Sequence, residues 1–468
     1  MRLLLPLALL LGSFALPARA QASLAEYGPV AEQIIAAATA DSASYDRLAT
    51  LADRFGHRFS GSESLEAAID WILAEMEGDG LESVRGQPVM VPVWTRGEES
   101  LRLVEPVERD LVVLGLGGSV GTPPEGVTAP VVVVRTFEEL QDRADEIEGH
   151  IVLFNAPFTS YGETVRFRIG GASAAAAAGA VASLIRSVGP FSMETPHTGT
   201  MRYQEGDRLI PHAAVTIEGA ELLQRFADRG ETPVVTLRMG ARTEPDALSR
   251  NVIAEIRGRE RPEEVVVMGG HIDSWDVGQG AMDDAGGSVV AWEALRVLHD
   301  LGLRPRRTIR VVLWTNEENG LRGALAYRDS VQAAGAMDRH VLAIESDSGV
   351  FEPVGFGFTG SEAAYALIQP VEALIEPLLA ETSTVYGRGV VRGGGGADIG
   401  PLMREGVPGM SLNTNNERYF WYHHTPADTV DKLDPGEVQR CVAMLAIMAY
   451  VVADLAPTLP REAVDAGG

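Results

Sequence analysis

Between residues 24 and 90, apolar side chains recur every three to four residues, the spacing that places them on one face of a helix. The stretches with this spacing contain Val30 and Ile34, then Leu48 and Leu51, then Ala67 to Met76. They predict amphipathic helices. Ser62 or Ser64 is placed to cap the last helix, and no G-x-S-x-G sequence surrounds either serine to indicate a nucleophile.

A different pattern follows between residues 108 and 245. Short runs rich in β-branched residues alternate with glycine and proline turns, at 131–134, 151–154, 181–185 and 234–237. One alanine-rich helix is expected at 172–180. This pattern predicts a separate β-rich unit, and its two isolated histidines, His197 and His212, are interpreted as surface or turn residues.

From Asn251 onward the pattern is strand, loop and helix, repeated. Apolar runs of strand length occur at 252–256, 265–268, 309–314, 341–344 and 408–412. Helical patterns separate or follow them, at 285–301, 361–379 and 436–454. The alternation predicts an α/β fold with a doubly wound mixed, mostly parallel sheet flanked by helices. In such sheets, ligands bind beyond the carboxyl ends of the strands.

The N-terminus has the pattern of a secretory signal peptide. An apolar run from Leu3 to Leu16 precedes Ala18-Arg19-Ala20, a small-residue cleavage sequence. We expect a signal peptide at 1–20, cleaved near Ala20, and a secreted or periplasmic protein. The run is shorter than a membrane span, and the sequence suggests no other spanning segment, so no membrane partner is expected. The expected units are the signal peptide at 1–20, an N-terminal part of the catalytic domain at 21–107, an insert at 108–245, the main catalytic domain at 246–456 and a tail at 457–468.

Net charge and cysteine content narrow the partners and the compartment. The formal net charge is −26, which argues against nucleic acid as a partner. Cys441 is the only cysteine, so no intramolecular disulfide can form. A lone thiol fits a bacterial periplasm or exterior better than a small disulfide-rich secreted scaffold.

Histidines and carboxylates follow the predicted strands of the C-terminal half. His271 and Asp273 come after the run ending near Met268, and Glu317 and Glu318 come after the run ending at Trp314. Asp347 follows 341–344, and His424 follows the last predicted strand. Because these strand ends meet at one edge of the sheet, the side chains are expected to form one site.

The side chains expected at this site determine which metal ions it could bind. Two imidazoles and three carboxylates suit two zinc-like ions if one carboxylate is shared. The proposed metal ligands are His271, Asp283, Glu318, Asp347 and His424. Each ion would keep open positions, as catalytic rather than structural sites do. Asp283 is the favoured bridge, while Asp276 and Asp284 remain rivals on spacing alone, and Asp284 could instead cap the following helix.

Two further carboxylates have predicted roles beside the metal ligands. Glu317 is adjacent to a ligand and is expected to act as general base, taking a proton from water and returning it to the leaving amine. Asp273 is expected to support His271 by accepting its ring N–H rather than to bind metal.

The segments that carry these residues resemble the co-catalytic zinc exopeptidases, the aminopeptidase and glutamate carboxypeptidase family. The similar segments are Gly269 to Ser274, Asp283 to Gly287, Asn316 to Gly320, Glu345 to Asp347 and His424 to Thr429. The resemblance implies the same five ligands, with Glu317 as base, and favours Asp283 over Asp284 as the bridge. It also implies a cis peptide between Asp283 and Asp284. The loop Ser274 to Met282 most resembles the carboxypeptidase Q branch.

The resemblance extends to other parts of the chain. The segment at 108–245 looks like a protease-associated domain, which some members insert into the catalytic domain. Residues Arg392 to Asp398 resemble the family's glycine-rich loop near the substrate, where glycines would let the backbone approach closely. A nucleotide site is rejected for this loop because no Lys-Ser/Thr pair follows. A homodimer is also implied.

The leading hypothesis is a secreted or periplasmic di-zinc exopeptidase that acts on dipeptides or short peptides. An aminopeptidase acting on longer peptides is the alternative, because both enzymes would use the same metal ligands. A non-catalytic binding or receptor protein on the same scaffold is the alternative from a different class. The presence of all five ligands and of Glu317 argues against it.

Overall fold

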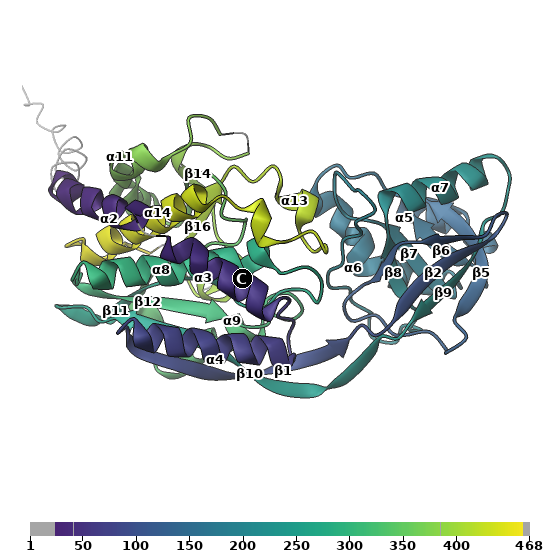
Figure 1. Cartoon of the computed structure of the whole chain (residues 1–468), viewed down its shortest axis with the longest axis horizontal. Coiled ribbons are helices and arrows are strands. Elements are labelled where there is room, and N and C mark those ends of the chain that lie inside the picture. The colour runs from purple at the N-terminus through teal and green to yellow at the C-terminus, as the bar shows by residue number, and fades with distance from the viewer. Residues whose placement is uncertain (1–23, 41, 384, 462–468) are drawn as a thin grey trace, which may run out of the picture.

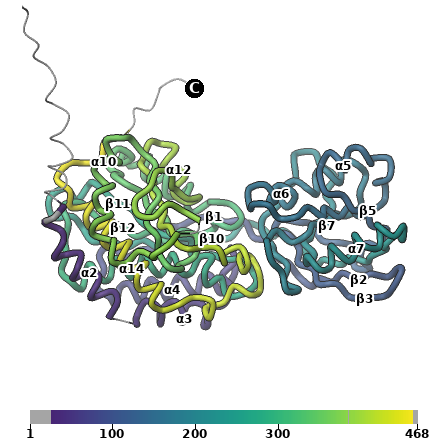
Figure 2. The backbone as a smooth tube through the Cα atoms, turned by 90° about the horizontal axis from the view of Figure 1, so that it is seen from above, coloured from purple at the N-terminus to yellow at the C-terminus, as the bar shows by residue number. Residues whose placement is uncertain are grey.

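The computed structural model describes residues 24–40, 42–383 and 385–461. These residues form two lobes that lie side by side along the long axis of the molecule (Figures 1 and 2). Each lobe is built on an eight-stranded sheet. The predicted signal peptide lies outside the described residues.

The first lobe contains the predicted mixed sheet, with strand order β1-β10-β12-β11-β13-β16-β14-β15. Four of its pairings are parallel, among them the central ones of β11 with β12 and with β13. Its strands are β1 (Glu82–Thr95), β10 (Arg242–Ile256), β11 (Arg261–His271), β12 (Arg307–Trp314), β13 (His340–Glu345), β14 (Pro353–Thr359), β15 (Gly389–Arg392) and β16 (Gly409–Thr414).

Helices cover both faces of this sheet because the side chains of each strand alternate between the faces. Val266 and Met268 of β11 face the larger core, whereas Val265 and Val267 face a smaller one. The helices over the larger core are α2 (Gly28–Ala40), α3 (Ala43–Phe55), α4 (Glu63–Gly78), α8 (Gly286–Asp300), α10 (Glu362–Ile368), α11 (Glu372–Ile375) and α14 (Pro435–Asp454). Those over the smaller core are α9 (Arg322–Ala333) and α12 (Gly400–Arg404).

Most of the predicted elements of this lobe are confirmed. All five apolar runs are strands, and the hydroxyl of Ser62 accepts a hydrogen bond from Leu65 N at the start of α4. The helix predicted at 361–379 is instead broken into α10, η5 (Gln369–Val371), α11 and η6 (Glu376–Leu378). The prolines at positions 370 and 377 start the two 3-10 turns, because proline lacks the N–H that would continue an α-helix.

One expectation about membrane segments is wrong. Within the described ranges, α14 is long and apolar enough, by length and composition, to cross a bilayer. In the structure 78% of its most apolar window is buried, and it packs against α8 and α2. Its hydrophobicity therefore follows from its place as a central core helix, enclosed on most sides.

The second lobe comprises residues 99–239, with strand order β3-β2-β9-β5-β6-β7-β8-β4. Its strands are β2 (Glu99–Glu105), β3 (Arg109–Leu111), β4 (Val113–Gly115), β5 (Val127–Val134), β6 (Ile151–Phe154), β7 (Ala182–Arg186), β8 (His212–Val215) and β9 (Val234–Met239). One core lies under α7 (Ile217–Asp228), and another lies under α5 (Phe137–Asp142) and α6 (Tyr161–Ala177). The alanine-rich helix is thus α6, which begins eleven residues earlier than expected.

The second lobe is connected to the first through two long paired strands. β1 and β10 run antiparallel from the Glu82 and Glu255 pair to the Thr95 and Arg242 pair, and the residues between them form the second lobe. The predicted boundary at residue 108 falls after β2, which pairs with β9 in the second sheet. β2 escaped notice because only its alternate residues Leu101 and Leu103 are buried.

Candidate metal centre

The predicted ligands converge at the carboxyl ends of three neighbouring parallel strands. His271 is the last residue of β11, Glu318 lies four residues beyond β12, and Asp347 lies two residues beyond β13. Asp283 lies in the short irregular turn η3 (Ala281–Ala285), which precedes α8. His424 comes from the loop after α13 (Tyr419–Tyr422).

Asp283 lies between two sets of side chains. Its Oδ1 is 3.1 Å from Nε2 of His271, which is 3.5 Å from Oδ1 of Asp347. Its Oδ2 is 3.1 Å from Nε2 of His424, which is 3.0 Å from Oε2 of Glu318. One carboxylate oxygen therefore faces each set, the arrangement that a bridging ligand needs.

These side chains fit bound cations. Apart from these contacts with imidazole nitrogens, Asp283 Oδ2, Glu318 Oε1 and Asp347 Oδ1 are buried oxygens without a hydrogen-bond donor among the described residues. Buried anionic oxygens without partners are strongly unfavourable, and a cation would supply what they lack. The groups that could hold an ion combine His271 with Asp283 and Glu318, His271 with Asp284 and Asp347, and Asp283 with His423 and His424.

The two rivals for the bridging position have other partners. Asp284 accepts hydrogen bonds from Gly287 N at 3.0 Å and from His271 N at 3.1 Å. It therefore holds the start of α8 against the end of β11, which agrees with a capping role. Asp276 forms a two-pronged ion pair with Arg96. The peptide bond between Asp283 and Asp284 is cis, as the resemblance implies.

Asp273 supports His271, but not through the expected atoms. Nδ1 of His271 is 2.9 Å from the backbone carbonyl oxygen of Asp273 and 3.7 Å from its carboxylate. The carboxylate instead accepts hydrogen bonds from the backbone N–H groups of Glu317 and Glu318. Asp273 therefore orients both His271 and the segment that carries the predicted base.

Burial shapes the proton affinities of the acidic side chains. It raises the pKa of Glu318 to about 7, and the nearby Asp283 carboxylate adds to this effect. Burial also raises the pKa of Glu317 well above its usual range, with Asp347 and Glu318 contributing. Uncompensated buried carboxylates favour the protonated form, and bound cations would oppose this shift.

Arg58 and Asp428, which sequence reasoning did not single out, hold the ligand loops. The fully buried Arg58 donates to the carbonyls of Ile272, Gln279 and Gly280, so it fixes the loop between His271 and Asp283. Asp428 accepts hydrogen bonds from the three successive N–H groups of residues 281–283. The sequence did offer one indication of Asp428, because it lies in the segment His424 to Thr429, which carries part of the family resemblance.

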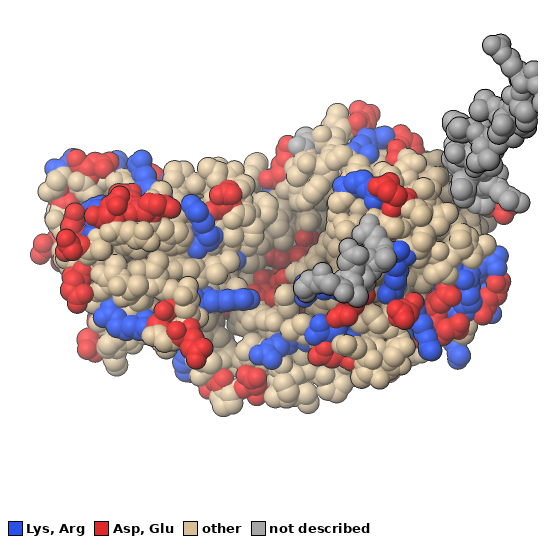
Figure 3. All heavy atoms as spheres, turned by 180° about the vertical axis from the view of Figure 1, so that it is seen from behind, with Lys and Arg blue, Asp and Glu red and all other residues tan. Residues whose placement is uncertain are grey.

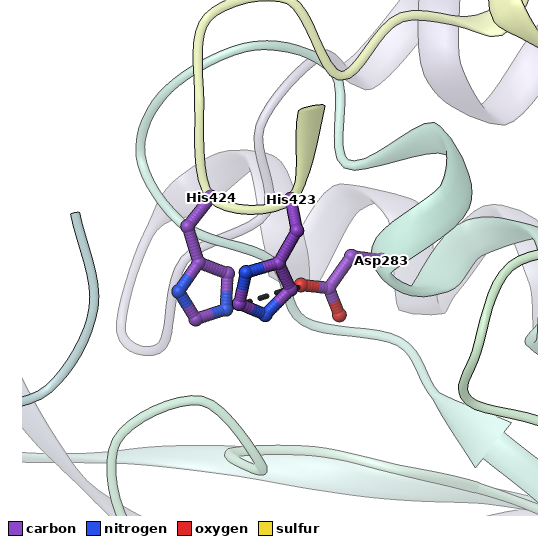
Figure 4. Close-up of side chains that lie close together, drawn as sticks. All are labelled: Asp283, His423 and His424. Atoms are coloured by element: carbon purple, nitrogen blue, oxygen red, sulfur yellow. Dashed lines mark ion pairs between the residues drawn. The ribbon is translucent and has the colours of Figure 1, made fainter. Parts of the chain in front are cut away.

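His423 was also missed. Its ring stacks on that of His424, with centroids 3.5 Å apart, and its Nε2 lies 3.4 Å from Asp283 Oδ2 (Figure 4). Burial and the neighbouring His424 lower the pKa of His423 well below its usual range, so its imidazole is neutral at pH 7. It is therefore a further imidazole at the metal centre.

The centre opens into a cleft between the lobes with a volume of about 380 Å³. Acidic side chains lie at the floor of the hollow that separates the lobes (Figure 3). Glu317, Asp347 and His424 line the cleft from the first lobe, and Arg168 and Arg202 line it from the second. The site is therefore formed by both lobes.

One expectation outside the ligand set is corrected. His197 and His212 are buried rather than on the surface, and burial lowers their pKa values to about 3 and about 4. Within residues 392–398, Asp398 is buried, and burial together with the nearby Glu345 and Glu317 carboxylates raises its pKa well above the usual range. A Cβ at Gly396 would overlap the carboxylate of Glu345, so glycine there lets the loop pack on a buried side chain.

The fold and the site define the class: an α/β protein with clustered histidines and carboxylates at the strand ends, as in metal-dependent hydrolases. The model of peptidase family M28 matches residues 251–449. The chain is 47% identical to carboxypeptidase Q of Bos taurus and of Homo sapiens, over 94% of this chain and 92% of each relative. The chain belongs to peptidase family M28 and is a metallopeptidase.

Solved structures agree with this assignment. A peptidase M28 precursor from Shewanella amazonensis is 35% identical, with a TM-score of 0.88 over 96% of this chain and 100% of that one. An aminopeptidase from Aneurinibacillus sp. strain AM-1 shares the fold, with 22% identity and a TM-score of 0.65 over 93% of this chain and 98% of that one. The predicted fold and the predicted enzyme family are confirmed.

Proposed function

We propose that this metallopeptidase is a secreted or periplasmic di-zinc exopeptidase that hydrolyses dipeptides or short peptides. The position of Asp283 between two sets of ligands carries the proposal. His271 and Asp347 would hold one ion and His424 and Glu318 the other, with Asp283 shared. The chemistry that two bound zinc ions supply is Lewis-acid activation of the scissile carbonyl and of water.

Glu317 is proposed as the residue that moves the proton. It lines the cleft beside Glu318, and its backbone N–H is fixed by the Asp273 carboxylate at 3.0 Å. The Glu317 carboxylate takes a proton from the attacking water as the C–O bond forms. It then gives that proton to the amide nitrogen as the C–N bond breaks.

The second lobe supports the preference for short substrates. Its cleft wall presents Arg168, which is buried, and Arg202, which is exposed and whose guanidinium has no hydrogen bond or ion pair within the described ranges. A guanidinium recognises carboxylates. A short peptide whose scissile bond lies at the metal centre would place its terminal carboxylate toward this wall. We also propose that this lobe corresponds to the protease-associated domain implied by the resemblance.

A substrate panel tests the proposal. Purified protein with a measured zinc content is given an unblocked dipeptide, the same dipeptide blocked at its N-terminus, its C-terminal amide, and a hexapeptide. We expect two zinc ions per chain and the highest kcat/KM for the unblocked dipeptide. Equal or higher kcat/KM on the hexapeptide would indicate the alternative, an aminopeptidase for longer peptides. Absence of zinc binding and of hydrolysis would indicate a binding protein.

A further inference from the structure

The second lobe reaches one of the proposed metal ligands through its backbone. The carbonyl oxygen of Thr198 lies 3.3 Å from Nδ1 of His424, and Thr198 N donates to the His424 carbonyl at 2.9 Å. Nη1 of Arg168, from the same lobe as Thr198, donates to the Thr198 carbonyl at 3.2 Å and lies 3.4 Å from Nδ1 of His424. Metal-binding histidines are usually oriented by an acceptor at their second ring nitrogen. For His424 this acceptor is supplied by the other lobe, 226 positions away in the sequence.

The Thr198 hydroxyl is held in turn by one backbone group and one side chain at the lobe boundary. Its hydroxyl donates to the carbonyl of Gly115 at 2.8 Å and accepts from Nη2 of Arg96 at 3.2 Å. Arg96 directly follows β1, at the crossing between the lobes. Its guanidinium also donates to Gly115 O and to both carboxylate oxygens of Asp276.

Asp276 belongs to the loop that joins His271 to Asp283, and this loop is anchored in the second lobe. The preceding Trp275 is buried within the second lobe's core, and a Cβ at Gly117 would overlap its ring. The Trp275 ring also lies 5.7 Å from that of His424. Arg96 therefore links two segments of the metal centre. One is the loop between His271 and Asp283, and the other is the backbone at Thr198, which orients His424.

We propose that Arg96 is a positioning residue for the metal centre. It acts through Asp276 and Thr198, so that metal binding at His424 and docking of the second lobe stabilise each other. The proposal rests on the proposed di-zinc centre. By linkage, weakening the contact between the lobes must weaken zinc binding, and zinc binding must tighten that contact.

The test compares substitutions at both ends of the contact. Arg96→Gln removes the pair with Asp276, and Arg96→Lys keeps a charge but not the planar fork that reaches three partners. Thr198→Val removes only the hydroxyl from a side chain of the same shape, and Thr198→Ser keeps it. Arg186→Gln is the matched control, because Arg186 pairs with Glu221 inside the second lobe at a similar burial.

Zinc affinity is measured for each of the two ions by chelator competition on the full chain, and amide hydrogen exchange is followed at residues 196–200 with and without zinc. We expect Arg96→Gln to weaken the binding of one zinc ion by about 10-fold or more. We also expect it to abolish the protection from hydrogen exchange that zinc gives to the Thr198 amide. Thr198→Val should shift both readouts in the same direction, Arg96→Lys should be intermediate, and Thr198→Ser and Arg186→Gln should match the wild type.

Unchanged zinc affinity in both Arg96→Gln and Thr198→Val would overturn the proposal. An equal loss in Arg186→Gln would also overturn it, because the effect would then be general destabilisation of the lobe. Failure of the wild-type protein to bind zinc would instead refute the di-zinc function itself. Thr198→Val keeps the test available if Arg96→Gln does not fold.

Discussion

Asp428→Asn is the sharpest test of how the loop that carries Asp283 is held. The Asp428 carboxylate is buried, and its Oδ1 accepts from Ala281 N and Met282 N, both at 2.9 Å. Its Oδ2 accepts from Asp283 N at 3.2 Å. Asparagine can keep the first two bonds through its carbonyl oxygen, but it turns an N–H₂ group toward the third donor.

The expected cost follows from that geometry. One buried backbone N–H loses its acceptor, which costs about 1–3 kcal/mol. Removing the charge offsets part of this, because burial already disfavours the charged carboxylate and raises the pKa of Asp428 to about 7. We therefore expect the free energy of unfolding of the metal-free protein to fall by about 1–2 kcal/mol. We expect zinc affinity to fall by about 10- to 100-fold, because the backbone of the bridging residue moves.

Urea unfolding of the metal-free protein and chelator competition for zinc measure the two effects. Asp434→Asn is the matched control, since Asp434 accepts from Gly436 N and Glu437 N at the exposed start of α14. Asparagine caps helices as well as aspartate, so this control should leave both quantities unchanged. If Asp428→Asn behaves like the control in both assays, Asp428 does not position the Asp283 loop.

The remaining predictions concern catalysis, the bridge and pH. Glu317→Gln should retain both metals by elemental analysis and lower kcat by at least about 10²-fold, and undiminished hydrolysis would rule out Glu317 as the base. Asp283→Ala should lower both zinc occupancy and activity, and full occupancy would show that Asp283 is not the bridge. His212 has a folded-state pKa of about 4, because burial in the second lobe disfavours its cation. Between pH 6.5 and 4, His212 therefore binds a proton in the unfolded chain but not in the folded one. Its contribution to the free energy of unfolding is fully present above pH 6.5, and up to about 3 kcal/mol is lost as the pH drops to 4. His212→Gln should lack this component in unfolding curves recorded across that range, and an identical pH dependence in the variant would contradict the assignment.

The buried strand β14 was missed, because Gly355 and Gly357 interrupt its apolar residues, whereas buried strands with a continuous apolar run were predicted. β11, β12 and β13 are of this kind, and the ligands were found by looking just beyond their ends. β1 was missed because only three of its 14 residues are buried, and β15 because it is four residues long and begins with glycine.

The supporting residues could not be predicted in the same way. The contacts of Arg58 with Gln279 and Gly280 join residues more than 200 positions apart. The same holds for the contact between Thr198 and His424. No local periodicity encodes such contacts, since they depend on how the lobes and loops pack. Asp428 is the exception, because it lies in the same short motif as His424.

The loop from Ser274 to Met282 connects the support of the proposed metal ligands with the shape of the substrate cleft. Its first part docks on the second lobe through Trp275 and Asp276, and its last part is held by Arg58 and Asp428. The wall of the cleft that carries Arg168 and Arg202 belongs to that same lobe. A change in the docking of the second lobe would therefore move the cationic wall and the acceptor for His424 together. It follows that variants at the lobe boundary should alter substrate preference and zinc affinity in parallel, whereas variants inside either core should not.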